Sequence, residues 1–458
     1  MCRILTAAVV LFASLFTSLI SVSYPASAKR QSLILDTEIE NILRAYAVPL
    51  FKIAGLKASE VKIYIVNDDT LNAFVAGGQK LFINSGLILR SDNANQIVGV
   101  IAHETGHIAG GHLSRTQDAL SNASASSIAA LILGGAAAVA TGRGDIGAVV
   151  AAGGQGAAAR NFLAYSRTQE GAADHAALGF LDKTGQSAKG FLAFMNKLGD
   201  QELLSTAQQD PYVRSHPLAR ERIDAVAHHV ANSRFSASPG PAEFDRLYAR
   251  MKAKLYAFIH PYTQTKRIYT DKDNSIPSRY ARAVAEFRRP RLDAALTLIN
   301  GLIRDLPGDP YFHELKGQML FENGNALGAV KAYTKAAELL PDAPLIRRDL
   351  ARAQLEANDP ALLGAAISNL EIALSKDRQS ARNWRFLAIA YGRSGDLPRS
   401  YLALGEEALN IGKPEVARFQ AKRARGLFPH GSREWLQAED ILLAADQLER
   451  RLKRQQDQ

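Results

Sequence analysis

The chain has 458 residues, a formal net charge of +10 and a single cysteine, Cys2. A chain of this length is too long for one compact core and predicts two or three domains. Because no cysteine follows Cys2, disulfides, thiol chemistry and cysteine-ligated metals are excluded downstream of it, and a metal site must use His, Asp or Glu.

The first 28 residues have the pattern of a secretory signal peptide. Arg3 is followed by an apolar run from Ile4 to about Val22, then by Tyr24-Pro25-Ala26-Ser27-Ala28, a helix breaker that leads into a small-residue site. We expect cleavage between Ala28 and Lys29 and export of the mature chain. An uncleaved membrane anchor is disfavoured, because the run carries several Ser and Thr residues and lacks a basic stop. No later segment is long and apolar enough to span a bilayer.

A small sheet is predicted next, before a helix that carries the first functional motif. Apolar residues recur at helical spacing from Asp36 to Leu56. Alternation and turn residues then predict a strand over Val61–Val66 and a hairpin-like element made of Asn72–Val75, Gly77-Gly78 and Lys80–Asn84. The functional helix is expected from roughly Asn93 to His112, capped by Ser91-Asp92 and closed by Gly110-Gly111.

The segment from Ala119 to Ala159 is rich in Ala and Gly, with Arg143 and Asp145 as its only charged residues. It predicts two helical arms, Ile128–Ala140 and Ile146–Ala159. Each arm reaches about 20 Å, short of the roughly 30 Å hydrocarbon core of a bilayer. A lid beside an active site, a contact with a bilayer surface and ordinary core all remain open for this hairpin.

The second half of the chain repeats with the period of a two-helix tetratricopeptide unit. The run Ala231–Pro241 reads as a linker, and residues 242–275 as a connecting helix and loop. Pro307 and Pro341 lie 34 residues apart, as do Pro310 and Pro344. Small residues recur where two helices of such a unit cross closely, among them Gly317, Gly324, Ala329 and Ala336. Five units are expected, with residues 344–380 irregular.

These patterns predict a mainly α protein with five segments. The fold class is an α+β domain with a small sheet, followed by an all-α tetratricopeptide-repeat solenoid. The expected segments are a signal peptide (1–28), the α+β domain (29–230), a linker and connecting helix (231–275), the repeats (276–432), and a capping helix with a basic tail (433–458). Such repeats bind polypeptide and carry no chemistry, so catalysis belongs upstream.

The motif His103-Glu104-Thr105-Gly106-His107 indicates a zinc site. A spacing of four places both imidazoles on one helical face, where they can share an ion, while Glu104 projects beside them. Zinc lowers the pKa of a bound water to around 7, and Glu104 can take its proton as that water attacks a peptide carbonyl.

A third protein ligand is expected in the segment from Tyr165 to Asp174. Glu170 and Asp174 are four residues apart and share a helical face, so one carboxylate can reach zinc while the other orients a ligand histidine. A solvated acidic face is the alternative. Small apolar residues around the pair mark the helix as buried, where an unpaired carboxylate would be costly.

The two motifs together resemble the gluzincin peptidases of the HtpX and CAAX-prenyl-protease type, peptidase family M48. The resemblance rests on His103–His107, Tyr165-Ser166-Arg167, and Glu170 with Ala173-Asp174. It implies that residues 29–230 are a zincin-type catalytic domain, a zinc metallopeptidase. It also implies one zinc ion held by His103, His107 and Glu170, with Glu104 as general base and Asp174 supporting a ligand. It also implies that Asn72-Ala73-Phe74 and Lys80–Asn84 lie beside the cleft, where an extended substrate could add as a strand. The membrane embedding of some relatives is not carried over, because the arms are too short.

Two more histidines need a role. His112 lies five residues past His107 and falls on another helical face, which favours packing or support over ligation. His216, in Ser215-His216-Pro217, resembles a downstream segment of the family. We expect His216 to approach the metal, either to stabilise the oxyanion of the transition state or to occupy the open metal position in a resting state, a structural helix start being the alternative.

The resemblance, with a signal peptide in front and repeats behind, implies a zinc endopeptidase of the bacterial periplasm that acts in quality control and assembly of outer-membrane or envelope proteins. Expected partners are unfolded or misassembled envelope polypeptides and, through the repeats, outer-membrane assembly proteins. The excess of positive charge lies after about Glu243 and could face anionic lipid or an acidic partner, although solvated helix faces are the commoner explanation. Nucleic acid is not expected. The alternative function is a chaperone or scaffold whose zinc site is latent.

Overall fold

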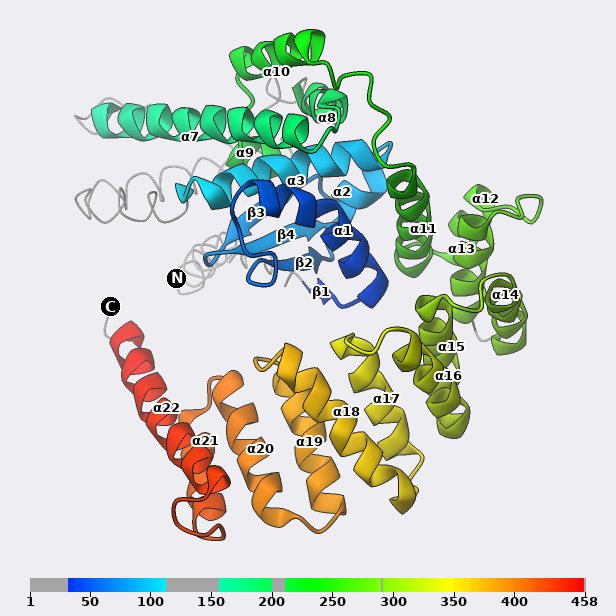
Figure 1. Ribbon diagram of the computed structural model, residues 1–458, viewed down its shortest axis with the longest axis vertical. Helices are drawn as coiled ribbons and strands as arrows, with labels where there is room; N and C mark the ends of the chain where they lie inside the picture. Colours follow the sequence, from blue (N-terminus) through cyan, green and yellow to red (C-terminus); the bar gives the residue numbers. More distant parts are fainter. Residues whose placement is uncertain (1–31, 113–155, 200–210, 290, 457–458) are drawn as a thin grey trace, which may run out of the picture.

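The computed structural model describes residues 32–112, 156–199, 211–289 and 291–456. The predicted signal peptide and nearly all of the predicted arms lie outside these ranges. Within the described residues, no helix combines the length and the apolar composition that a membrane span requires. Two parts are visible in Figure 1: a body that contains a sheet, and a helical arc that curves beneath it.

The predicted small sheet is present and has four strands in the order β1-β2-β4-β3. The strands are β1 (Leu33–Ile34), β2 (Lys62–Val66), β3 (Ala73–Ala76) and β4 (Lys80–Asn84). The two central strands β2 and β4 are parallel, whereas β1 and β3 pair antiparallel at the two edges. Alternate side chains of β2 and β4 are buried, so one face of the sheet packs on the core.

Helices cover the buried face of the sheet. The amphipathic helix α1 (Thr37–Ile53) and the helix α3 (Ala94–Ala109) share one hydrophobic core with the inner residues of β2 and β4. The short helix α2 (Ser85–Arg90) precedes α3. On the other side of α3 lie α7 (Gly156–Lys183), α8 (Lys189–Gly199), α9 (Pro211–Ser215) and α10 (Arg220–Asn232), of which α7 and α10 are seen above it in Figure 1. Helix α3 is therefore central to this body.

The predicted cap of α3 is wrong by one residue. The side chain of Asn93 accepts a hydrogen bond from the backbone N–H of Gln96 and forms the N-cap. Ser91 instead closes α2, because its hydroxyl donates to the carbonyl of Leu87 at 2.7 Å. The carboxylate of Asp92 accepts from the side chain of Gln96 and pairs with Lys197. The hydroxyl of Ser91 is therefore used within α2, and the carboxylate of Asp92 is used by Gln96 and by the distant Lys197.

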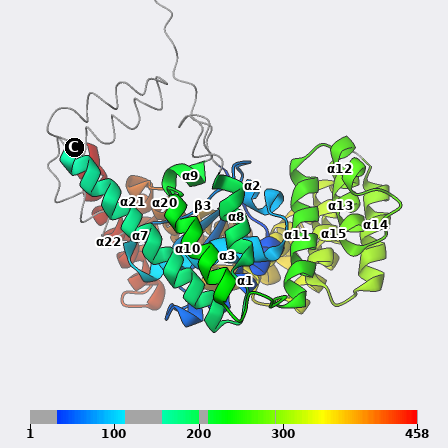
Figure 2. The ribbon, with the colours of Figure 1, turned by 90° about the horizontal axis from the view of Figure 1, so that it is seen from above.

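Helix α11 (Ala242–Ile259) joins the two parts, and Figure 2 shows it between them. Tyr248 and Met251 belong to the core of the sheet-containing body, whereas Ala253 and Ala257 belong to the first core of the arc. Buried charges reinforce this joint. Glu38 of α1, which is fully buried, pairs with Arg250 and Lys254 of α11 and accepts a hydrogen bond from the hydroxyl of Tyr280.

The arc consists of helices in consecutive pairs, as expected for the repeats. After α12 (Tyr262–Ile268) the pairs are α13 (Ile276–Phe287) with α14 (Leu292–Asp305), α15 (Pro310–Glu322) with α16 (Ala326–Leu339), α17 (Pro344–Glu356) with α18 (Leu363–Lys376), and α19 (Ala381–Arg393) with α20 (Leu397–Asn410). Helix α21 (Pro414–Arg425) follows, and α22 (Arg433–Gln456), predicted as the capping helix, packs on α20 and α21. A 3-10 turn, η2 (Pro360–Leu362), lies in the stretch predicted to be irregular.

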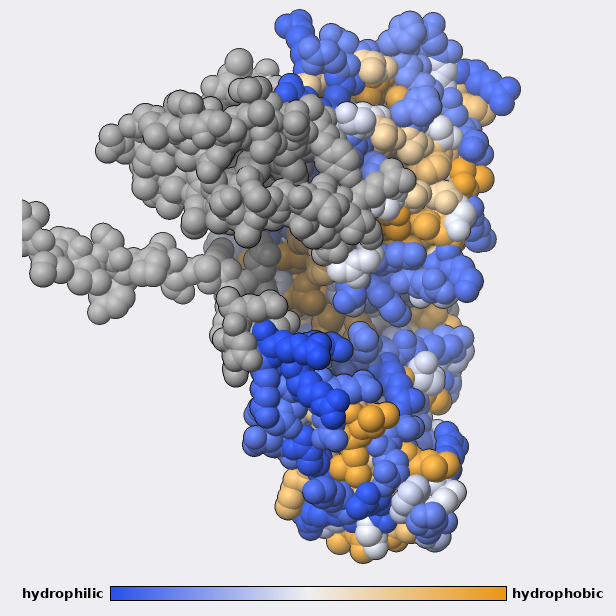
Figure 3. Space-filling model, turned by 90° about the vertical axis from the view of Figure 1, so that its left-hand side faces the viewer, coloured by the Kyte–Doolittle hydropathy of each residue, from blue (hydrophilic) through white to orange (hydrophobic). Residues whose placement is uncertain are grey.

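Close helix crossing explains the small residues of the repeat pattern. A Cβ added at Gly317 of α15 would lie 2.8 Å from the ring of Tyr333 in α16, so only glycine fits there. The mainly α architecture with one small sheet is confirmed. Figure 3 shows that the surface is hollowed between the sheet-containing body and the last repeats, with hydrophobic residues inside the hollow.

Candidate metal centre

Helix α3 brings the two histidines of the first motif together. His103 is fully buried and His107 is half-buried, and their Nε2 atoms lie 3.1 Å apart. The spacing of four residues places them one helical turn apart on the same face. Both rings present a nitrogen to the same point, as predicted.

Helix α7 supplies the carboxylate that faces both histidines. The Oε2 atom of Glu170 lies 3.4 Å from Nε2 of His103, and Oε1 lies 3.4 Å from Nε2 of His107. Gly106 allows this close approach, because a Cβ at that position would lie 2.8 Å from the carbonyl oxygen of Ala173. The glycine between the two histidines thus sets the distance between α3 and the helix that carries Glu170.

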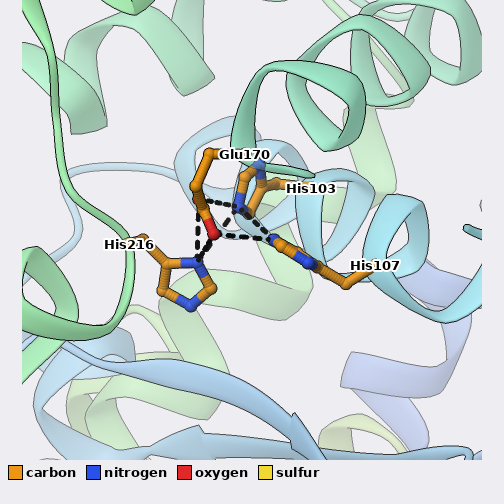
Figure 4. Close-up of side chains that lie close together, drawn as sticks. All are labelled: His103, His107, Glu170 and His216. Atoms are coloured by element: carbon orange, nitrogen blue, oxygen red, sulfur yellow. Dashed lines mark hydrogen bonds and ion pairs between the residues drawn. The ribbon is translucent and has the colours of Figure 1, made fainter. Parts of the chain in front are cut away.

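His216 completes the group from a third element (Figure 4). Its Nδ1 atom lies 3.1 Å from Oε2 of Glu170 and 3.4 Å from Nε2 of His103. The residue follows α9, and its ring stacks on Tyr212 with centroids 4.5 Å apart. This stacking holds the imidazole against the other three side chains.

The four side chains fit a tetrahedral zinc ion. Their ligand atoms all lie within 4.8 Å of one another, and the contacts described above between neighbouring side chains of the group measure 3.1 to 3.4 Å. Nitrogen and oxygen atoms bound to zinc at 2.0–2.2 Å in a tetrahedron are separated from one another by about 3.3 Å. The donor set of three imidazoles and one carboxylate is also one that zinc prefers.

Asp174 lies one helical turn beyond Glu170 and contacts the other nitrogen of His103. Its Oδ1 atom is 2.8 Å from Nδ1 of His103. Arg222 of α10 donates to both oxygens of Asp174, and its Nη1 lies 3.0 Å from Oε2 of Glu170 and donates to the carbonyl of Pro217 at 2.7 Å. One guanidinium therefore connects the two carboxylates to the segment that carries His216.

Glu104 is fully buried beside the cluster and faces His216. Its Oε1 atom lies 3.4 Å from Nε2 of His216, and neither carboxylate oxygen has a hydrogen-bond partner among the described residues. Burial raises the pKa of Glu104, because a charged carboxylate is poorly solvated there. A carboxylate with free lone pairs and a raised pKa is suited to accept a proton.

The electrostatics of the cluster favour a bound cation. Burial alone would raise the pKa of Glu170 and lower that of His103, but neighbouring groups outweigh it. Contacts with His103, His107 and His216 hold the pKa of Glu170 well below its usual range, and Asp174, followed by Glu170, raises the pKa of His103 to about 9. Burial lowers the pKa of His107 to about 4, so its ring stays neutral and its nitrogen lone pair is available. A bound metal ion would stabilise the negative charge of Glu170 in place of the proton on His103.

The remaining histidine of the first helix lies outside this group. Nδ1 of His112 is 3.0 Å from Nδ1 of His107, on the side of that ring away from Glu170. This position is compatible with the packing or supporting role that was favoured for His112 over ligation.

Arg222 and Tyr212 are the residues that sequence reasoning did not assign. Arg222 lies six residues after His216, the residue for which the family resemblance was noted. A single arginine in a helix, however, has no sequence pattern from which its contacts could be predicted.

The comparisons with known proteins place the four clustered side chains inside a segment that matches a peptidase family. Residues 35–230 match the model of peptidase family M48. The beta-barrel assembly-enhancing protease of Yersinia pestis is 24% identical over 358 residues, which cover 76% of this chain and 71% of that protein. The protein of the same name from Escherichia coli (strain K12) is 22% identical over 413 residues, covering 85% of this chain and 83% of that protein. Both alignments are longer than the family match, so the likeness extends into the helical arc.

Proposed function

Because residues 35–230 of this chain form a peptidase family M48 domain, the chain is a metallopeptidase, and we propose that it is a zinc-dependent endopeptidase of the bacterial periplasm. The proposed role is quality control and assembly of outer-membrane or other envelope proteins. The name of the relatives, beta-barrel assembly-enhancing protease, and the predicted signal peptide support this role.

The observation that carries the proposal is the convergence of four ligand atoms within 4.8 Å next to a buried carboxylate. We assign His103, His107 and Glu170 as zinc ligands and Asp174 as the group that orients His103. Glu104 is the proposed general base, because it lies on the helix that carries His103 and His107 and its carboxylate oxygens accept no hydrogen bond from a described residue.

Zinc, when bound, supplies Lewis-acid chemistry that polarises a peptide carbonyl and acidifies water. Glu104 would accept the proton of the attacking water and return it to the nitrogen of the leaving amine. Burial supports both steps: the raised pKa brings Glu104 closer to the range where it can accept and return a proton. Asp174 and Arg222 hold His103 and Glu170 in place during this cycle.

His216 is assigned a switching role. Three protein ligands and one open position are needed for catalysis, whereas four protein ligands close a zinc site. With Nδ1 of His216 beside Glu170 and His103, the arrangement matches a resting state in which His216 fills the open position. The alternative role for the same side chain is to donate a hydrogen bond to the oxyanion of the transition state.

The free edge of the sheet is the proposed place for substrate. Strand β3 is terminal among the described strands and packs against α3. An extended polypeptide added along β3 would pair with its backbone, which gives affinity without a strict sequence requirement. The repeats would hold other parts of unfolded envelope polypeptides, or an outer-membrane assembly protein, in a fixed position relative to this edge.

A chaperone or scaffold with a latent zinc site is the second candidate. The presence of His216 in the ligand group favours it, because such a site has no open position. A scaffold, however, has no need of an unpartnered buried Glu104 next to the ligands.

Cleavage of casein and of unfolded porin by the mature protein and by Glu104→Gln separates the two candidates. The variant keeps the shape of the side chain but cannot accept the proton, so we expect a loss of at least 100-fold in turnover with one zinc per chain retained in both proteins. Equal turnover by the two proteins would contradict the proposed peptidase activity. Absence of zinc from carefully prepared wild-type protein would remove the metal centre.

A further inference from the structure

Three aromatic side chains form a continuous row across the face of the sheet that lies opposite its hydrophobic core. Phe82 of β4 stacks on Tyr64 of β2, with ring centroids 5.1 Å apart, and on Phe74 of β3, with centroids 5.0 Å apart. The three residues are direct partners in the register of the sheet. All three are half-buried, whereas their neighbours in β2 and β4 are buried on the opposite face. The row ends at Phe74, on the edge strand.

The backbone pairing shows which groups of β3 remain available. Antiparallel pairs alternate between hydrogen-bonded and non-hydrogen-bonded positions. The backbone N–H of Asn84 donates to the carbonyl of Asn72, so by alternation Phe74 and Phe82 also form a hydrogen-bonded pair. The N–H and C=O groups of Ala73 and Val75 therefore point to the other side, where no described strand pairs with them.

A polypeptide strand that pairs antiparallel with this edge would bond to Ala73 and Val75, and one of its residues would lie opposite Phe74. That pair would be of the non-hydrogen-bonded kind, in which Cα atoms are only about 4.5 Å apart and the side chains are closest. Residues on either side of it would point to the buried face of the sheet, on which α3 packs.

We propose that Phe74 selects an aromatic side chain at one position of the substrate, as the fourth ring of the row Tyr64–Phe82–Phe74. The inference rests on the proposed function, in which the substrate adds to β3, and deepens it by naming a class of substrate: extended segments with an aromatic residue, flanked by residues of any kind that point toward α3. A cross-strand aromatic pair adds a favourable contact that a serine at the same position cannot make.

The test uses one peptide that the zinc-loaded full chain cleaves at a mapped bond. Each position within four residues of that bond is changed singly to Phe and to Ser, and kcat/KM is measured. We expect one position at which Phe is preferred over Ser by roughly 3- to 10-fold, the range of an aromatic pair. The positions on either side of it should show no such preference, because their side chains point to the other face.

Phe74→Ser and Phe74→Leu should bring that ratio close to one while zinc content stays at one per chain. Tyr64→Ser is the matched control. It removes a half-buried ring of the same row, but strands β4 and β3 lie between this ring and the substrate, so the ratio of kcat/KM for Phe over Ser should be unchanged. Thermal midpoints show whether each variant is folded. A preference that survives in both Phe74 variants, or that appears at adjacent positions alike, would overturn the proposal.

Peptide binding to Glu104→Gln, measured by fluorescence anisotropy, reads the same preference without turnover. If the wild type cleaves no peptide but the Phe peptide binds Glu104→Gln more tightly than the Ser peptide, and Phe74→Ser abolishes the difference, the proposed function fails and this inference stands. If the Phe and Ser peptides are cleaved with equal kcat/KM whichever position is changed, and also bind equally, the inference is wrong and the proposed peptidase activity is supported.

Discussion

Arg222 donates hydrogen bonds to both carboxylate oxygens of Asp174, from Nε at 2.6 Å and from Nη2 at 2.9 Å, and all of these atoms are buried. The same guanidinium contacts Glu170 and the carbonyl of Pro217. A single side chain thus fixes a proposed zinc ligand, the residue that orients a second ligand, and the segment that carries a third.

Arg222→Met should lower zinc affinity by about 10- to 100-fold, the usual effect of losing a group that orients metal ligands. Asp174 would stay buried with one cationic partner fewer, so the thermal midpoint of the zinc-free protein should fall as well. Chelator competition and thermal unfolding measure the two effects. Arg220→Met, an exposed arginine two residues earlier in α10, should change neither. Unchanged zinc affinity in Arg222→Met would contradict the role given to this residue.

Gly106→Ala and Gly171→Ala both place alanine in a helix, but only Gly106→Ala should weaken zinc binding. A Cβ at Gly106 meets the backbone of Ala173 at 2.8 Å, so α7 must move away and carry Glu170 with it. We expect at least a tenfold loss of zinc affinity. A Cβ at Gly171 meets no atom within 4 Å, so this variant should gain up to about 1 kcal/mol in free energy of unfolding from helix propensity. Equal zinc affinities in the two variants would show that close contact between α3 and α7 is unimportant.

His216→Ala should bind zinc more weakly and cleave peptides several times faster per zinc-loaded molecule. The variant loses one proposed ligand, and the position that it leaves becomes available for catalysis. Zinc titration and peptide turnover at saturating zinc check this expectation. His175→Ala, an exposed histidine of α7, serves as the control. Slower turnover with zinc retained would indicate that His216 stabilises the oxyanion instead. No change in zinc affinity or in turnover would show that His216 has no role at the site.

Glu40 of α1 should make the protein less stable as the pH rises. Burial, followed by the neighbouring Asp36, raises the pKa of this carboxyl from its ordinary value to about 7. A folded-state pKa above the unfolded one means that the stabilisation is complete below about pH 4.5 and is lost as the pH rises through 7. Glu40→Gln, which mimics the protonated form, should therefore be more stable than the wild type at pH 8, by on the order of 2 kcal/mol, and equal to it at pH 4.5.

Thermal midpoints at the two pH values measure this difference. Glu60→Gln is a suitable control, because Glu60 lies on the surface in an exposed pair with Lys57. The same gain for both variants at pH 8 would show a general effect of net charge instead of the burial of Glu40.

Local periodicity was sufficient to predict the parts of the fold that depend on it. The four-residue spacing of His103 and His107 predicts that both rings face one point, because a helix turns every 3.6 residues. The 34-residue spacing of Pro307 and Pro341 predicts a stack of helix pairs for the same kind of reason. The cap of α3 was predicted less well, because Ser91 bonds back to Leu87 in α2 and Asp92 pairs with Lys197, which is distant in sequence.

Periodicity also placed Glu170 and Asp174 on one helical face, but it could not say which of them faces the histidines. The tertiary structure decides this through the seating of α7 on α3: Glu170 meets Nε2 of both rings, whereas Asp174 meets Nδ1 of His103. His216 and Arg222 join the group across 46 and 48 residues of chain from their carboxylate partners. Contacts between distant segments have no sequence period, because they depend on how close two helices can pack, here limited by the missing side chain of Gly106.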